Sequence, residues 1–77
     1  MQHTWEHNVW TGEDILRLSD NERIIRQKFN DGSFLYRAEF WGDFSLLYPI
    51  KGSMKETLKS AKEDLVGLKI KDLHKAR

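Results

Sequence analysis

The residues best suited to bind a metal or catalyse a reaction lie near the N-terminus, where His3, Glu6 and His7 form the pattern H-x-x-E-H. This is the inverted zinc-peptidase motif, in which two helical histidines bind Zn²⁺ and the glutamate moves a proton. That chemistry needs a stable helix, a third ligand and a substrate cleft, whereas residues 1–10 show no helical period. We therefore predict no metal site here beyond occasional chelation by two imidazoles four residues apart.

Other catalytic patterns are missing from the sequence. It contains no Cys, no glycine-rich phosphate loop and no G-x-S-x-G elbow, and His74 stands alone in a basic segment. Asp31 and Asp43 fall in turn sequences, where a carboxylate favours hydrogen bonds to the nearby backbone. The sequence therefore predicts a protein that is not an enzyme and carries no cofactor.

Three strands are predicted in the centre of the chain, over residues 24–29, 33–41 and 44–51. Asp31-Gly32 marks the first turn, because glycine accepts positive φ without a steric penalty. Apolar side chains face each other if Phe40 pairs with Phe44 and Phe29 pairs with Phe34. In that register the buried residues are Phe34, Tyr36, Ala38, Phe40, Phe44, Leu46 and Tyr48. Because Ser19 and Glu22 also have capping-box spacing, a helix over 20–29 is the alternative to the first strand.

Helices are predicted on either side of these strands. Thr11 followed by Asp14 has N-cap spacing, so a short helix should cover 12–19, after an extended aromatic arm over 1–10. Ser53 and Glu56 form a capping box that should start a C-terminal helix. Its apolar stripe consists of Met54, Leu58, Ala61, Leu65 and Leu68. Val66, Ile70 and Leu73 belong to another face, so the helix either ends near Gly67 or presents a second surface.

Together these elements predict one α+β domain over residues 1–77. A three-stranded antiparallel sheet should be covered on one face by the C-terminal helix, with the folded core over 11–68 and a basic tail over 69–77. The order of strands, with Lys-Glu-Thr-Leu-Lys-Ser-Ala-Lys-Glu-Asp-Leu at 55–65, resembles two groups. These are the sheet-reading DNA-binding domains of plant transcription factors and phage integrase arms, and the small HicB-type antitoxins. The resemblance implies an architecture only.

Charge is distributed unevenly along the chain. Residues 1–22 hold one cation against five acids, and residues 23–77 hold twelve cations against seven acids. In the predicted register Arg26 lies across from Arg37 on the outer face of the sheet, a juxtaposition that an anion would relieve. Trp41 stands in a turn, and Trp is common at binding hot spots. The predicted partner-binding residues are Arg26, Lys28, Leu35, Arg37, Trp41, Lys55, Lys59 and Lys62.

These residues predict a small regulatory or inhibitory protein that contacts another protein through an apolar and cationic surface. The alternative is a nucleic-acid-binding module that uses the same basic face, although the formal net charge of +1 is low for one. The lack of Cys, of a leader-like segment and of any apolar run of ~20 residues predicts a cytoplasmic protein without a membrane partner.

Overall fold

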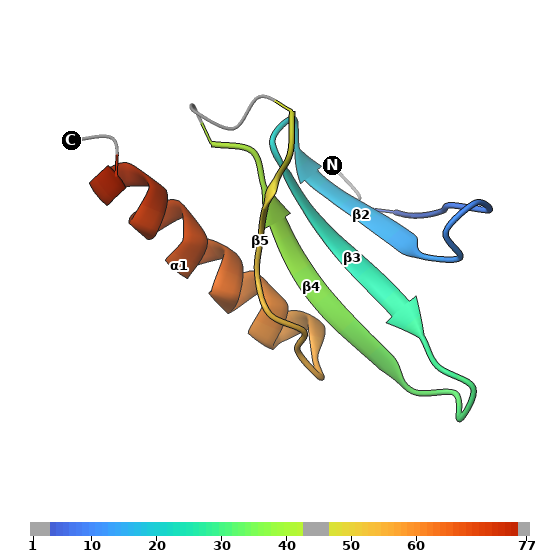
Figure 1. The fold of residues 1–77 in the computed structure, drawn as a ribbon. Coiled ribbons are helices and arrows are strands. Elements are labelled where there is room, and N and C mark those ends of the chain that lie inside the picture. The colour runs from blue at the N-terminus through green and yellow to red at the C-terminus, as the bar shows by residue number, and fades with distance from the viewer. Residues whose placement is uncertain (1–3, 43–46, 76–77) are drawn as a thin grey trace.

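The strands of this protein form a meander, followed by one long helix. A computed structural model describes residues 4–42 and 47–75 (Figure 1). The elements are β1 Trp5–His7, β2 Asp14–Ser19, β3 Glu22–Lys28, β4 Phe34–Phe40, β5 Ile50–Lys51 and α1 Leu58–Lys75. The antiparallel sheet has the order β1-β2-β3-β4-β5. The predicted α+β class with a C-terminal helix is confirmed, but the sheet has five strands and not three.

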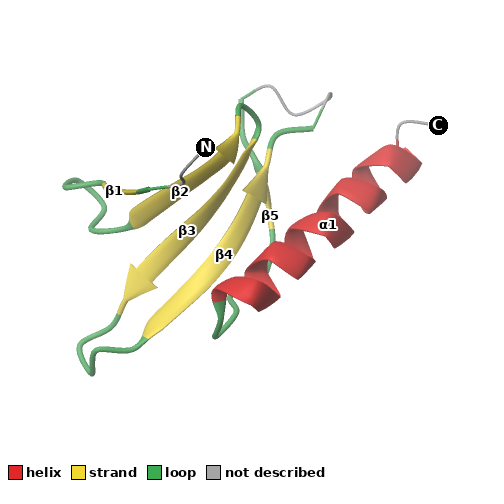
Figure 2. Cartoon of the chain, turned by 180° about the vertical axis from the view of Figure 1, so that it is seen from behind, coloured by secondary structure: helices red, strands yellow, loops and turns green. Residues whose placement is uncertain are grey.

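Helix α1 lies on one side of the sheet and covers only part of it. It contacts β4 above all, and β3 to a smaller extent. Figures 1 and 2 agree that β1 and β2 lie toward the edge of the sheet that is remote from the helix. The helix-side face of the sheet therefore has a covered half, near β4, and a half that the helix does not reach.

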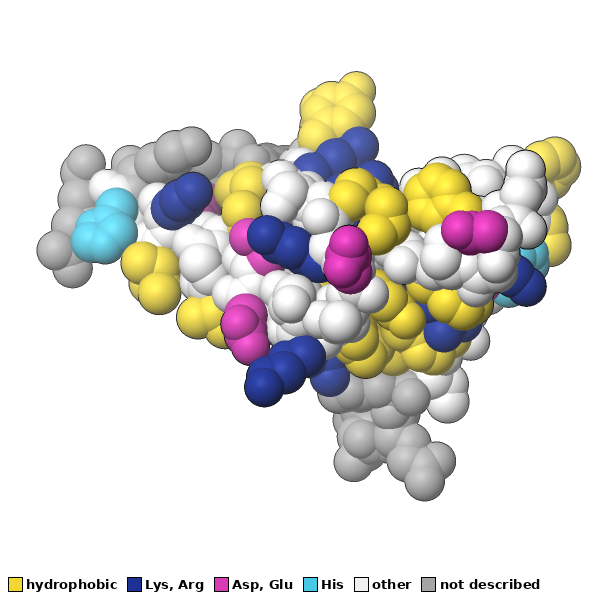
Figure 3. All heavy atoms as spheres, turned by 90° about the horizontal axis from the view of Figure 1, so that it is seen from below, with side chains coloured by type: hydrophobic (Ala, Val, Ile, Leu, Met, Phe, Trp, Pro, Cys, Tyr) yellow, Lys and Arg dark blue, Asp and Glu magenta, His cyan; other side chains and the backbone are white. Residues whose placement is uncertain are grey.

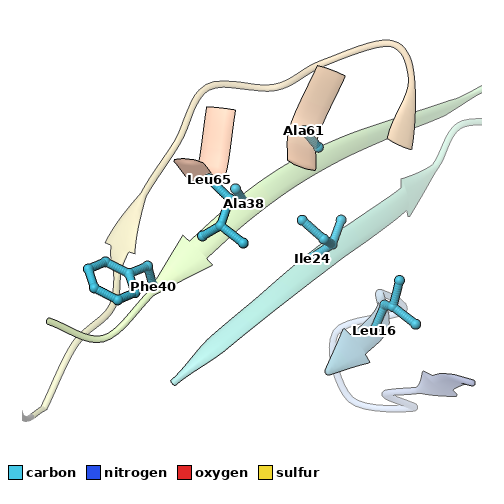
Figure 4. Close-up of a cluster of buried hydrophobic side chains, with 6 residues drawn as sticks. All are labelled: Leu16, Ile24, Ala38, Phe40, Ala61 and Leu65. Atoms are coloured by element: carbon cyan, nitrogen blue, oxygen red, sulfur yellow. The ribbon is translucent and has the colours of Figure 1, made fainter. Parts of the chain in front are cut away.

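The core forms where the helix meets the sheet. Figure 4 shows Ala61 and Leu65 of α1 directed toward Ala38 and Ile24, with Phe40 and Leu16 on either side. All six are buried, Ile24, Ala38 and Ala61 completely. Leu58 and Leu68 pack against the same cluster. The predicted sheet-facing stripe of the helix is thus confirmed for its four residues from Leu58 to Leu68.

The predicted strand at the start of the central region is confirmed against its helical alternative, but its register is wrong by one residue. Ile24 pairs with Ala38, and Arg26 pairs with Tyr36 instead of lying across from Arg37. The loop is one residue shorter than predicted, because Phe29 pairs with Ser33: its N–H donates to the Ser33 carbonyl at 2.9 Å. Gly32 at φ 88° closes this three-residue loop in the conformation that glycine accepts most easily. The slip exchanges the two faces of β3.

The predicted hairpin after β4 is also wrong. Phe40 pairs with Ile50, so the described strand β5 is short and follows a long connection. Tyr48, predicted to be buried, is 78% exposed. Phe44 and Leu46 lie outside the described residues. Pro49, which cannot donate a ladder hydrogen bond, directly precedes β5, and β5 is the last strand of the sheet, as predicted.

The predicted helix over 12–19 is a strand. Residues Asp14–Ser19 form β2, which pairs with β1 on one side and β3 on the other. The Thr11 hydroxyl does accept a backbone hydrogen bond, from the Glu13 N–H at 3.2 Å, but in a turn that leads into β2. The predicted extended arm is confirmed to the extent that Trp5–His7 forms strand β1.

Helix α1 starts later than predicted, and of the two ends that the sequence left open it has the later one, with a second surface past Gly67. Its cap is Thr57, whose hydroxyl accepts the Ser60 N–H at 3.1 Å, so the Ser53/Glu56 capping box is wrong. Met54 lies before the helix and is 37% exposed. The helix continues through Gly67 to Lys75, which makes most of the predicted tail helical. Among the described helical residues, no segment is long and apolar enough to cross a membrane.

Candidate interaction surfaces

Arg26 lies on the helix side of the sheet, in the half that α1 leaves uncovered. Its guanidinium lies 4.1 Å from the ring centroid of Trp5 and 4.9 Å from that of Phe34. Trp5 and Tyr36 also contact each other, with 6.2 Å between their centroids. Arg26 is therefore part of an aromatic layer that covers this half of the sheet. Its predicted place on the outer face, beside Arg37, is wrong because of the register slip.

Asp14 fixes this arginine from the neighbouring strand. Arg26 donates to the carboxylate from Nε at 3.0 Å and from Nη2 at 2.9 Å. The other carboxylate oxygen lies 2.8 Å from His7 Nδ1 on β1. The hydrogen bond from His7, helped by Arg26, holds the pKa of Asp14 below its usual range. The row His7–Asp14–Arg26 thus ties three neighbouring strands together.

The opposite face of the sheet carries an ion cluster, which consists of Arg23, Arg37, Glu39 and Glu13. The Glu39 side chain is only 1% exposed. Arg23 Nε donates to one of its oxygens at 2.7 Å and Arg37 Nε donates to the other at 3.0 Å. Glu13 lies 3.8 Å from Arg37. A buried carboxylate must be paired, and two arginines provide this pairing.

Trp41 extends this cluster at the end of β4. The Arg23 guanidinium lies 4.6 Å from its ring centroid, which is cation–π distance. Its backbone is held by Asn21, whose carbonyl accepts the Trp41 N–H at 2.9 Å. Trp41 is partly buried. Its ring is therefore folded back onto the sheet and is not free in the turn.

The outer face of α1 carries three apolar side chains that nothing in the described chain covers. Val66, Ile70 and Leu73 are 57%, 50% and 69% exposed. They follow one another at spacings of four and three residues, so they form one stripe, which we call the outer stripe. Toward the start of the helix the outer stripe leads into a shallow hollow. The hollow is lined by Leu58, Lys59, Lys62, Glu63 and Val66.

Lysines border this face of the helix. Lys59 and Lys62 are exposed beside the hollow. Lys69 is tied to the sheet, because its ammonium lies 2.6 Å from Glu22 at the start of β3. Hydrogen bonds from Lys69 and then Ser19 lower the pKa of Glu22. Lys69 therefore helps to position the helix, and Lys59 and Lys62 remain available to a partner.

The eight predicted partner-binding residues do not form one surface. Arg37 and Leu35 lie on the face opposite the helix, with Trp41 at its end. Arg26 and Lys28 lie on the other face of β3, across from Tyr36 and Phe34. Lys55 forms a backbone bridge to Tyr36, and Lys59 and Lys62 belong to the outer face of α1. The outer stripe was missed as a binding site, although its separate helical face is visible in the sequence.

The N-terminal histidine motif is not on a helix. His7 belongs to strand β1, and Glu6 lies 3.5 Å from Arg17 on β2. His3 lies outside the described residues. Within residues 4–42 and 47–75, no group of three His, Cys, Asp or Glu residues is placed to hold a metal ion.

Charged side chains of both signs are mixed over the surface. Figure 3 shows Lys and Arg side chains separated by Asp, Glu and hydrophobic side chains on the face it presents. The described arginines each lie close to a carboxylate: Arg17 to Glu6, Arg23 and Arg37 to Glu39, and Arg26 to Asp14. The positive charge of the sheet is thus largely compensated within the chain.

Comparison with known proteins found no similar protein. No family model matches the chain, and neither the curated proteins nor the solved structures include a significant match.

Proposed function

We propose that this protein is a small non-catalytic regulatory or inhibitory module that acts by binding another protein through the outer face of α1. The observation that carries the proposal is the outer stripe of Val66, Ile70 and Leu73, which remains at least half exposed on a helix whose other face is packed. A contiguous exposed apolar surface with a polar border is typical of a protein interaction site.

The lysines beside the outer stripe fit the same role. Lys59 and Lys62 stand where the hollow opens, next to Leu58 and Val66. An interface of this kind has an apolar centre and a charged border, and the border determines which partners approach and how fast. The predicted binding role thus stays with the helix lysines, while Arg26 and Arg37 are occupied by internal ion pairs.

Binding to nucleic acid is the competing proposal, and it is less well supported. Phosphate recognition relies on cations that are free to displace counterions. In the sheet the arginines already have carboxylate partners. The helix lysines that remain available, Lys59 and Lys62, lie next to Val66 and Ile70, which offer nothing to a phosphate.

Co-purification from the cells that encode the protein tests the proposal. A tagged chain should recover a protein in near-stoichiometric amount, and nuclease treatment should leave this recovery unchanged. Ile70→Asp should abolish it, because a charge in the apolar centre stays unpaired on binding. Val9→Asp is the matched control, since Val9 is 77% exposed in the β1–β2 loop.

Two results would contradict the proposal. One is a partner protein that is retained equally by the Ile70→Asp and Val9→Asp chains. The other is binding to generic duplex DNA whose affinity falls steeply with salt and is reduced by Lys59→Glu but unaffected by Ile70→Asp.

A further inference from the structure

The spacing of residues along the outer face of α1 identifies the shape of its partner. Lys59, Glu63, Val66, Ile70 and Leu73 follow one another at intervals of four, three, four and three residues. Apolar residues at this alternation keep one seam of a helix in contact with a second helix, and three of the five positions here, Val66, Ile70 and Leu73, are apolar. The seam is apolar in its C-terminal part and charged at its start, and it extends over about 21 Å at 1.5 Å per residue.

Gly67 lies beside this seam, and no described contact within the chain requires a glycine at this position. It stands inside an 18-residue helix, where glycine is less favourable than alanine. A Cβ added at Gly67 would meet nothing within 4 Å. Ser60, seven residues earlier and therefore on the same side, is also small. A flank of small residues lets the backbone of a second helix approach closely.

The opposite flank of the seam is cationic. Lys62 and Lys69 occupy it, and Lys59 and Glu63 stand at the start of the seam itself. Since Lys69 is paired with Glu22, Lys59 and Lys62 remain for a partner. A second copy of this chain would oppose Lys62 with the same lysines if it docked antiparallel, and with the Ser60 and Gly67 flank, which carries no acid, if it docked parallel.

We infer that the outer stripe binds an amphipathic α-helix of another protein, whose apolar seam is flanked by Asp or Glu residues that face Lys59 and Lys62. The partner helix lies along the seam, between the Ser60 and Gly67 flank on one side and the Lys62 flank on the other. This inference rests on the proposed function and specifies the chemistry of the partner.

Two synthetic helical peptides test the inference. Both carry the same Leu and Ile seam, and their flanking positions hold Glu in one and Lys in the other. Fluorescence anisotropy should show about tenfold tighter binding of the Glu peptide at ~50 mM salt, and a smaller difference at ~500 mM, where charges are screened. Ile70→Asp should weaken binding of the Glu peptide at least about tenfold.

Matched variants separate the contributions. Lys62→Glu should remove most of the preference for the Glu peptide, while Lys71→Glu, on the same helix but off the seam, should retain it. Gly67→Ala should raise the melting temperature by about 4 °C or more, yet weaken peptide binding several-fold. That combination is informative because a merely structural glycine would not lower affinity when the fold becomes more stable.

Several outcomes would overturn the inference. Equal binding of the two peptides would refute the acidic flank, and unchanged affinity of the Gly67→Ala chain would refute the close approach. Sedimentation showing a dimer that Ile70→Asp dissociates would make the occupant a second copy. If neither peptide binds while Ile70→Asp still abolishes recovery of the cellular partner, the inference fails and the proposed function stands.

Discussion

Replacing Glu39 by Gln should destabilise the protein strongly, although Glu39 lies on the sheet face that α1 does not cover. The change keeps the size of the side chain and removes the charge that holds Arg23 and Arg37. Breaking a fully buried ion pair costs about 3–5 kcal/mol. Here the two arginine side chains are 24% and 21% exposed, so water can solvate part of the charge that is left. We therefore expect a loss of about 2–3 kcal/mol in the free energy of unfolding.

A chain of this length has a free energy of unfolding of about 4–12 kcal/mol, so the loss is readily measured. Urea denaturation followed by circular dichroism gives the midpoint, and equal slopes confirm that compactness is unchanged. Glu6→Gln is the matched control. Glu6 and Arg17 are 3.5 Å apart with about 60% of each side chain exposed, so its loss should cost under about 1 kcal/mol. If the two variants unfold at the same urea concentration, Glu39 does not organise the ion cluster.

Three further predictions concern the fold. Leu65→Ala should cost about 2–5 kcal/mol in thermal or urea melts, because Leu65 is buried, while Leu73→Ala should leave stability nearly unchanged. The pKa of Asp14 is lowered in the folded chain, so its carboxylate stabilises the protein above the unfolded pKa of about 3.9, and this contribution is lost as the pH falls through the folded value. Asp14→Asn should therefore melt below the parent at neutral pH and converge with it in acid; a constant gap would contradict this. Gly52→Ala should lower the melting temperature slightly, because the Asp64 carboxylate must turn away from the new Cβ, in contrast to the rise expected for Gly67→Ala.

The packed side of the helix could be predicted from the sequence because its signal is local and periodic. Leu58, Ala61, Leu65 and Leu68 repeat at helical spacing, and only one face of a helix can hold all four. The start of the helix was missed because Ser53 and Glu56 satisfy the capping pattern as well as Thr57 does. Which candidate caps the helix depends on where the chain leaves β5, and that is decided by tertiary packing.

The register of β3 could not be fixed by the same reasoning. A loop of four residues sets Phe29 against Phe34, and this apolar pair looks favourable in the sequence. The observed three-residue loop is favoured instead by Asn30-Asp31-Gly32. Its Asp31 carboxylate accepts the Ser33 N–H at 2.9 Å, and its glycine adopts positive φ. The loss of the Phe29–Phe34 pair is offset by burial of Ile24 under the helix. A prediction that considers only pairs of side chains across two strands does not include this contact with the helix.

The positions of the candidate site residues could be predicted only in part, for a related reason. Lys59 and Lys62, predicted in a lysine stripe on one side of the helix, are exposed on α1, but Arg26 and Arg37 were assigned to a single surface. A slip of one residue places them on opposite faces of the sheet. Sequence parity cannot show that Arg26 has Asp14 within reach, because this acid comes from another strand, whereas Glu39 lies two residues from Arg37 on the same face of β4.

The strand order has a consequence for how the chain folds during synthesis. Each of the strands β1 to β4 pairs with the next one along the chain across a short loop, at low entropic cost, so these pairings can form soon after each strand leaves the ribosome. The helix comes last. At ~5–20 residues per second, roughly one to five seconds separate Phe40 from Leu65, and during this time Ile24 and Ala38 face water. Rare codons placed in this interval would lengthen the exposure of an apolar sheet and favour aggregation of the nascent chain.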